Sequence, residues 1–570
     1  MVYLECIMET ICSKTKEQVD LLVYNAVIYT VNEQYTKAEA FAVKKGRFVA
    51  VGSTEYICDN YTSEQELDWK GKWVYPGFHD AHCHLILKGI DNSYAKLDDA
   101  KNFNEILDRV NRHKNKHHLE YEWVVGVGWD QHKWDKSIEP TNKELNRQHP
   151  DVPIVLRRTD CHAVIANEKA IERLIELKGE SAINQKEANF ETGVFVENTA
   201  NLFMTTIIEQ ISDKKKRKLI LQAAEECYQN GLTSITDAGI PAGLPLSYIK
   251  MIDDLQKSGD LKLRVNALID PKENIEIYKE TNLTTDRLTV RCIKLIMDGA
   301  LGSNGAFMLA PFENEPYKTG ICNYPNEEIK VFLDFCQRAY DAGLQVATHC
   351  IGDRANQEVL KLYEQVFKKN NVKGVNDLRW RIEHAQIIDK GDFEKFRKNS
   401  VVPSVQPTHA TSDTFVKNAE EKSMAENKLG KERLHRAYAY KNLKEQLGWL
   451  PFGTDFPVEE INPIHTFFAA IFRKKLIRTK DGFKIAEGDA FQIDDAVSRE
   501  DALSAMTIWA AKASFDEGKK GSIDCGKWAD FVVLDRDIIN EEVKEQDIPN
   551  TKVLCTYIAG EEVYNHENNN

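Results

Sequence analysis

Residues 73–85 read WVYPGFHDAHCHL, a β-branched and aromatic run followed by two histidines spaced two residues apart. The composition predicts a strand over residues 74–84. Side chains alternate along a strand, so His82 and His84 would project to one side and Cys83 to the other. Two neutral imidazoles at the end of a strand provide half of a metal site.

Beyond this stretch, strand-like runs alternate with helical ones, which is typical of parallel βαβ construction. Together with the first strand, seven further runs bring the expected number to eight. They cover residues 232–239, 261–269, 288–298, 344–350, 378–384, 401–407 and 450–455. Eight such strands fit a (β/α)₈ TIM barrel over residues 76–511.

Three other regions surround the expected barrel. Short strands divided by turns at both ends of the chain, within 18–75 and 512–566, could pair into one composite β domain. Residues from about 90 to 230 are too many for one crossover, so they predict an inserted subdomain. The polar segment 417–432 is expected to be either a mobile lid or a solvated helix.

Two further histidines and an aspartate end other strands. His349 follows the fifth, His384 the sixth and Asp455 the eighth. Either histidine alone would more often be a core residue, but side chains at the ends of barrel strands meet at one mouth. Four imidazoles and a carboxylate suit Zn²⁺, with Fe²⁺, Mn²⁺ or Ni²⁺ as replacements. His79 does not share the strand parity of His82 and stays outside this set.

Several ordered motifs resemble those of one enzyme family. They are DGALGSNGA (298–306), HCIGDRANQ (349–357), RIEHAQ (381–386), SVQPTHATSD (404–413), GTDFPV (453–458) and GSIDCGKWADFVVLD (521–535). Over nearly its whole length the chain resembles the amidohydrolase superfamily, in particular amidohydrolase family 3, the YtcJ-like branch that contains N-substituted formamide deformylase. The resemblance implies a (β/α)₈ barrel with a small β-sandwich built from both termini. It also implies hydrolysis of a C–N bond, of amide or formamide type, in a small molecule.

The resemblance further implies a ligand set. His82, His84 and Asp455 would hold one metal, and Lys294, His349 and His384 a second, with a carboxylated Lys294 as the bridge. The alternatives left open are a single metal with an unmodified Lys294, which pairs with Asp298 or contacts substrate. Asp455 would act as the acid and base, taking a proton from metal-activated water and passing it to the leaving amine.

A wider group of polar residues is expected around this centre, as substrate contacts or as residues that brace its loops. The group comprises His162, Glu197, Asp298, Asp353, Arg354, Gln406 and His409. Arg354 is the natural partner for a substrate carboxylate, because its planar fork binds one with two hydrogen bonds.

Composition limits the partners and the location. The formal net charge of −14 argues against nucleic-acid binding, and no apolar run is long enough for a membrane span. The first residues lack a convincing secretory signal, so a cytoplasmic enzyme is expected. A lipid anchor at Cys12, or export from a different start, is the alternative. A homodimer is left open.

Other functions remain in competition with the leading interpretation. Within the superfamily, an aminoacylase or a cyclic amidase would use the same centre. A catalytically silent scaffold or signalling protein is disfavoured because all six expected ligand positions are filled. A metal-storage protein would gather its ligands on the surface, whereas these histidines are mostly distributed over separate strands.

Overall fold

The computed structural model describes residues 16–98, 100–117, 123–131, 134, 140–158, 163–240, 243–272, 275, 283–416 and 421–569. Two compact units divide the chain. Ile86–Ala223 forms one, and Met1–Leu85 together with Ala224–Asn570 forms the other.

Seven parallel strands of the larger unit form one continuous sheet in the order of the sequence. They are β10 (Phe78–Cys83), β17 (Leu232–Asp237), β18 (Arg264–Ile269), β19 (Leu288–Ile296), β20 (Gln345–Cys350), β21 (Arg381–His384) and β22 (Val402–Ser404). Most of their residues are buried on both faces, as expected for strands enclosed by helices. Together with the closing segment described next, the sheet confirms the predicted TIM-barrel class.

The eighth position of the barrel is filled by a short extended segment, residues 451–456. On one side the Gly453 amide donates to the Val405 carbonyl at 3.0 Å. On the other, the Ala81 amide donates to the Phe452 carbonyl at 2.9 Å. A side chain at Gly453 would lie 2.5 Å from the His82 amide nitrogen, so only glycine permits this approach. The segment therefore closes the ring next to His82.

The predicted single strand 74–84 is wrong in one respect, because it divides at Gly77 into two strands of different sheets. β9 (Trp73–Pro76) pairs with β25 (Phe531–Leu534) near the other end of the chain, and β10 enters the barrel. At the division the Gly77 amide donates to the Asp530 carbonyl at 2.9 Å. A side chain on Gly77 would meet Thr233 at 2.3 Å.

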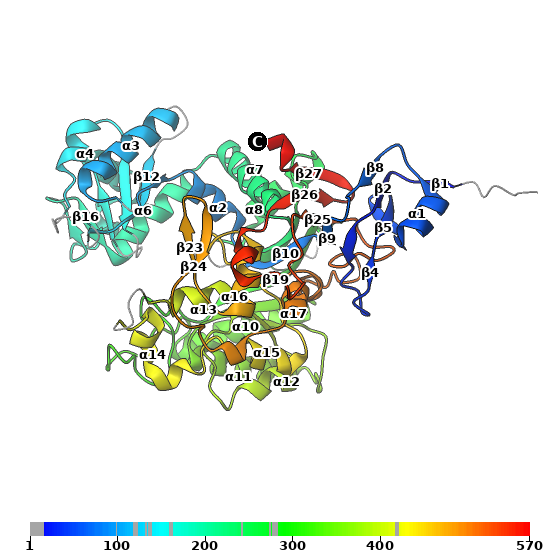
Figure 1. Cartoon of the computed structure of the whole chain (residues 1–570). Coiled ribbons are helices and arrows are strands. Elements are labelled where there is room, and N and C mark those ends of the chain that lie inside the picture. Colours follow the sequence, from blue (N-terminus) through cyan, green and yellow to red (C-terminus); the bar gives the residue numbers. More distant parts are fainter. Residues whose placement is uncertain are drawn as a thin grey trace, which may run out of the picture. The chain divides into compact units, whose positions relative to one another are not determined.

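Strands from both ends of the chain build the β domain, as the red and blue strands in Figure 1 show. One of its sheets has the order β27-β26-β25-β9-β3-β4 and the other the order β6-β5-β2-β8. Apolar side chains of both sheets, among them Val23, Phe41, Val74 and Phe531, share one core. The remaining strands are β2 (Leu21–Tyr24), β3 (Val27–Tyr29), β4 (Lys37–Ala38), β5 (Ala40–Lys44), β6 (Arg47–Gly52), β8 (Glu66–Asp68), β26 (Val553–Ile558) and β27 (Glu561–Asn565).

The smaller unit has a six-stranded mixed sheet of its own, in the order β11-β12-β13-β14-β16-β15. Its strands are β11 (Ala95–Lys96), β12 (Val124–Trp129), β13 (Ile154–Arg158), β14 (Ala163–Ala166), β15 (Ala188–Asn189) and β16 (Val194–Val196). Its helices include α3 (Phe103–His117), α5 (Glu168–Lys178) and α6 (Glu197–Glu209). Leu97, Ile106, Trp129 and Leu156 lie in its core, so this unit buries an apolar interior of its own.

Amphipathic helices follow the barrel strands. In α11 (Asp353–Lys369) the buried Ala355, Val359, Leu362 and Val366 recur every three to four residues, which produces one apolar face. The other helices of this part of the chain are α8 (Leu246–Lys257), α10 (Ile329–Asp341), α12 (Phe393–Asn399), α13 (Pro407–Asp413), α14 (Met424–Leu434), α15 (Tyr440–Leu447) and α16 (Pro463–Phe472). In the part of the chain that the structure describes, no helix combines the length and apolarity that a membrane crossing requires.

Candidate metal centre

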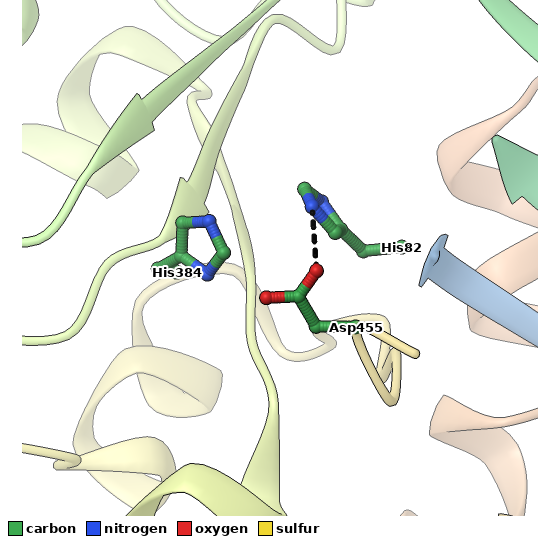
Figure 2. A group of neighbouring side chains, drawn as sticks. All are labelled: His82, His384 and Asp455. Carbon is green, nitrogen blue, oxygen red and sulfur yellow. Dashed lines mark ion pairs between the residues drawn. The ribbon is translucent and has the colours of Figure 1, made fainter. Parts of the chain in front are cut away.

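Side chains from three barrel positions converge at the carboxyl ends of the strands. His82 is on β10, His384 ends β21 and Asp455 lies on the closing segment. One ligand atom from each of the three lies within 4.8 Å of the others. Figure 2 shows the Asp455 carboxylate between the two rings, and its Oδ1 lies 3.6 Å from His82 Nε2. This trio could hold a metal ion.

The other predicted ligands surround this trio. His84 Nε2 lies 3.1 Å from Asp455 Oδ1, and the His349 ring centroid is 4.4 Å from that of His384. Lys294 is buried on β19, and its charge acts on both Glu383 and Asp455. The six predicted ligand residues are therefore neighbours at one mouth of the barrel, where active sites of this fold are built.

Three of the histidines are held in the same tautomer. His84 Nδ1 donates to the Gly239 carbonyl at 2.7 Å, and His384 Nδ1 to the Gln406 side-chain oxygen, also at 2.7 Å. His82 Nδ1 donates to the Glu383 carboxylate. Nδ1 is therefore the donor in all three rings, and in the neutral ring Nε2 has the lone pair that can bind a metal ion.

Backbone strain turns two of the side chains into the site. His384 has φ of 72° and Asp455 has φ of 62°, both in the left-handed region that non-glycine residues rarely adopt. Glu383, the preceding residue, faces Arg381 inside the barrel. In a regular strand His384 would point to the opposite side. The left-handed conformation lets Glu383 face Arg381 while His384 faces the site, at a cost of about 1–3 kcal/mol per residue.

Burial keeps the imidazoles of His82 and His349 neutral. It lowers the pKa of His82 to about 4 and that of His349 to about 3, with the Lys294 charge adding to both shifts. Burial would raise the pKa of Asp455, but the neighbouring His84, His82 and His384 hold it well below the usual value. Neutral imidazoles and an ionised carboxylate are the forms that bind a metal.

Lys294 is not paired with Asp298, so that alternative from the sequence is wrong. Asp298 instead accepts hydrogen bonds from the amides of Phe307, Ile351 and Gly352, at 2.8–3.0 Å. These bonds hold together the loops that follow two strands. Burial lowers the pKa of Lys294. A lowered pKa favours the neutral amine, which is the form that can react with CO₂.

The predicted pocket residues fall into different positions. Gln406 orients His384, as described above, and His409 Nε2 lies 3.7 Å from Asp455 Oδ2. Asp298 Oδ1 lies 3.6 Å from His349 Nε2. Asp353 accepts from the Leu309 amide at 2.8 Å, so it braces a loop.

Three other members of the predicted pocket need separate mention. Arg354 is exposed and lies over the Phe307 ring, 4.6 Å from its centroid. His162 lies outside the described residues. Glu197 begins α6, but its side chain is outside the described part of the chain.

Three residues next to the site were not predicted from the sequence. Glu383 and Arg381 form a buried ion pair directly behind His82. Opposite charges two residues apart in a strand share one face, and this was the available signal. Asp80 was missed too. Its carboxylate accepts from the amides of His82 and Thr454 and so ties β10 to the closing segment.

The donor set fits a divalent cation. His349 Nε2, His409 Nε2 and Asp455 Oδ1 are buried without a hydrogen-bond partner, although buried polar atoms rarely stay unsatisfied. Imidazole nitrogen and carboxylate oxygen are the usual ligands of zinc and similar metals. Buried atoms of this kind, gathered in one place, are best explained by an ion among them.

Comparisons with known proteins agree with this geometry. The chain is 29% identical to protein LONG AFTER FAR-RED 3 of Arabidopsis thaliana, over 96% of this chain and 91% of that protein. It is 25% identical to the putative amidohydrolase YtcJ of Bacillus subtilis, over 90% and 94% of the two chains. It is also 25% identical to N-substituted formamide deformylase of Arthrobacter pascens, over 95% and 97%.

A solved structure shares the architecture. It is an uncharacterized metal-dependent hydrolase from Pyrococcus horikoshii, with a TM-score of 0.75 and 26% identity, over 92% of this chain and 99% of that one. Together with the buried donor set, these similarities support a metal-dependent amidohydrolase. The amidohydrolase family model matches residues 65–564, which include the whole barrel and all six predicted ligands. The chain therefore belongs to the amidohydrolase family.

Proposed function

We propose that this protein uses a divalent metal to hydrolyse a C–N bond, of amide or formamide type, in a small molecule. The observation that carries the proposal is the buried trio His82, His384 and Asp455, whose ligand atoms lie within 4.8 Å of one another. Similarity to N-substituted formamide deformylase, over nearly the full length of both chains, supports the bond type.

For the ligands, His82, His84 and Asp455 would hold one metal ion, and Lys294, His349 and His384 a second. Zinc is the expected metal, with iron, manganese or nickel as replacements. Carboxylation of Lys294 would replace a buried cation by an anion that can bridge two metal ions. Its lowered pKa and the absence of an ion-pair partner among the described residues support this modification. A single-metal centre with unmodified Lys294 is the competing arrangement.

Asp455 has the position of the acid and base in this proposal. A divalent metal at the site supplies Lewis acidity, which makes water acidic enough to react near neutral pH. Asp455 would accept the proton and return it to the leaving nitrogen, since an amine departs poorly without one. His409 faces Asp455 Oδ2 at 3.7 Å and has an unpartnered Nε2. We place His409 as a contact to the substrate carbonyl group.

Metal content and hydrolysis, measured on the same preparation, test the proposal. Protein purified without chelator should contain one or two metal ions per chain and should hydrolyse members of a panel of N-acyl and N-formyl amines. The His82→Ala variant should lose both. His465→Ala is the matched control, because His465 is also buried but lies on α16, where it contacts the Pro549 carbonyl. Absence of metal, with no activity after Zn²⁺ or Mn²⁺ is added, would contradict the proposal.

Arg354 allows the substrate class to be narrowed. Arg354 is exposed at the start of α11, with its guanidinium over the Phe307 ring, and its fork could bind a carboxylate. If the enzyme is an aminoacylase, substrates with a carboxylate should react better than their amide-capped counterparts. Arg354→Ala should then remove that preference, while Arg354→Lys should keep part of it. Equal rates for both substrates would favour the formamide-type reaction.

A further inference from the structure

The three histidines with a defined tautomer differ in what accepts their Nδ1 proton. His84 donates to a backbone carbonyl and His384 to a side-chain amide, both neutral acceptors. His82 donates to the carboxylate of Glu383. A charged acceptor makes a stronger hydrogen bond and raises the basicity of the imidazole. Of the three, His82 is therefore prepared to be the strongest metal ligand.

A buried arginine holds Glu383 in place. Arg381 Nε donates to Glu383 Oε1 at 2.6 Å and Nη2 to Oε2 at 2.9 Å, so both oxygens are gripped. Arg381 Nη2 also donates to the Ala81 carbonyl at 2.8 Å and to Ser404 Oγ at 2.9 Å. The guanidinium therefore touches β10, β21 and β22 together.

The surroundings keep Glu383 ionised. Both side chains of the pair are 0% exposed. Arg381 donates a hydrogen bond to each Glu383 oxygen, so neither oxygen is placed to carry a proton. An ionised carboxylate can only accept hydrogen bonds. Glu383 therefore requires that His82 carry its proton on Nδ1.

We propose that Glu383, gripped by Arg381, is a positioning residue that fixes His82 in the Nδ1-protonated tautomer, with Nε2 turned toward the metal. The inference rests on the proposed function only in that His82 binds a metal ion. Glu383 Oε2 accepts from both Arg381 and His82, so the arginine sets where the ring can donate. Arg381 thus positions Glu383, and Glu383 in turn positions the His82 ring.

The competing explanation is that Arg381 and Glu383 form only a structural ion pair. The chain contains a comparison for this case. Arg264 grips Asp530 in the same way, with hydrogen bonds of 2.6 and 2.9 Å and exposures of 3% and 4%. Among the described residues, no histidine donates to Asp530, whose other donor is the Ala559 amide. Asp530→Asn is therefore the matched control for Glu383→Gln.

Replacing Glu383 by glutamine has a specific expected consequence. Arg381 can only donate hydrogen bonds, so the new amide oxygen would turn to Arg381. The amide NH₂ group would then face His82 Nδ1 and donate to it. This reverses the tautomer and puts a proton on Nε2, where the metal should bind.

The tautomer can be read in metal-free protein by ¹⁵N NMR of histidine-labelled samples, with the His82 signals assigned through His82→Asn. The wild type should show His82 protonated on Nδ1. Glu383→Gln should show the proton on Nε2 and bind Zn²⁺ about 10–100-fold more weakly in a chelator competition. Asp530→Asn should lose about as much stability in urea as Glu383→Gln does. It should nevertheless keep the His82 tautomer and the Zn²⁺ affinity of the wild type.

Two results would overturn the inference. One is a wild-type His82 protonated on Nε2, a measurement that does not depend on any variant folding. The other is a folded Glu383→Gln protein with wild-type Zn²⁺ affinity. Failure of the proposed function looks different, because then the wild type itself would bind no metal or hydrolyse nothing.

Discussion

Two buried arginine–carboxylate pairs of the larger unit have nearly the same geometry and different surroundings. Arg264 and Asp530 join β18 to the β domain, where Asp530 Oδ1 also accepts from the Ala559 amide at 2.8 Å. Arg381 and Glu383 lie on one strand, directly behind His82. Both pairs remove two charges from water, which costs free energy that only good hydrogen bonding offsets.

The difference between them is the third partner. In the first pair it is a backbone amide, so the pair fastens two parts of the fold. In the second it is the imidazole of a proposed metal ligand, so the same chemistry can orient a reactive side chain. Burial and charge therefore do not distinguish a functional ion pair from a structural one. The third group that donates to the carboxylate does.

The largest effect is expected for a substitution in the site itself, outside both ion pairs. Asp455→Asn removes the proposed acid and base, so turnover should fall by about 10²–10⁴-fold. The KM should change much less, since the loss is in the transition state. Steady-state kinetics, together with metal analysis, measure both. A raised KM with unchanged turnover would assign Asp455 to substrate binding instead.

The next largest effects are expected for the arginine substitutions Arg381→Met and Arg264→Met. Each leaves a buried carboxylate without its partner, so each should lower the free energy of unfolding by about 3–5 kcal/mol. Urea unfolding of the metal-free protein measures this. The comparison predicts that only Arg381→Met also weakens Zn²⁺ binding. Equal Zn²⁺ affinities in the two variants would remove the distinction between the pairs.

Acid should destabilise the metal-free protein through the histidines of the site. The folded protein lowers the pKa of His82 to about 4. The unfolded chain therefore binds more protons below pH about 6.5, and stability is lost as the pH falls from there to about 4. The loss from His82 could reach about 3 kcal/mol, and urea unfolding across this window measures it.

His82→Asn should flatten that pH dependence. His84 provides a control of opposite sign, because Asp455 raises its pKa against the effect of burial. Its contribution is complete below pH about 6.5 and is lost as the pH rises through the raised pKa. His84→Asn should therefore reduce the loss of stability that occurs as the pH rises. A stability curve that His82→Asn leaves unchanged would refute the assignment.

The smallest effect concerns the contact between the closing segment and β10. Gly453→Ala would place a methyl group against the His82 backbone and should cost about 1–3 kcal/mol of stability. Gly518→Ala is the control, since no atom lies within 4 Å of the added carbon there. Thermal unfolding of the two variants measures the difference. Weaker Zn²⁺ binding by Gly453→Ala alone would show that His82 is also positioned from this side.

Much of the site could be predicted from strand ends. His349, His384 and Asp455 were found because polar residues that end buried strands must meet at one barrel mouth. Glu383 was missed because its signal, a charge two residues from Arg381, is equally consistent with a plain ion pair. Predictions for the domain limits, the cytoplasmic location and a homodimer remain predictions.

The sequence by itself determined the alternation of strands and helices, the barrel class and the positions that carry imidazoles and carboxylates. These follow from local periodicity, which each segment carries in its own residues. Only the tertiary structure decided that β9 leaves the barrel to pair with β25, and that His384 and Asp455 turn inward through left-handed backbone. Only the tertiary structure also decided that Glu383 meets His82 across 301 positions of the chain. Contacts of that kind depend on which distant surfaces close together, and no local pattern encodes them.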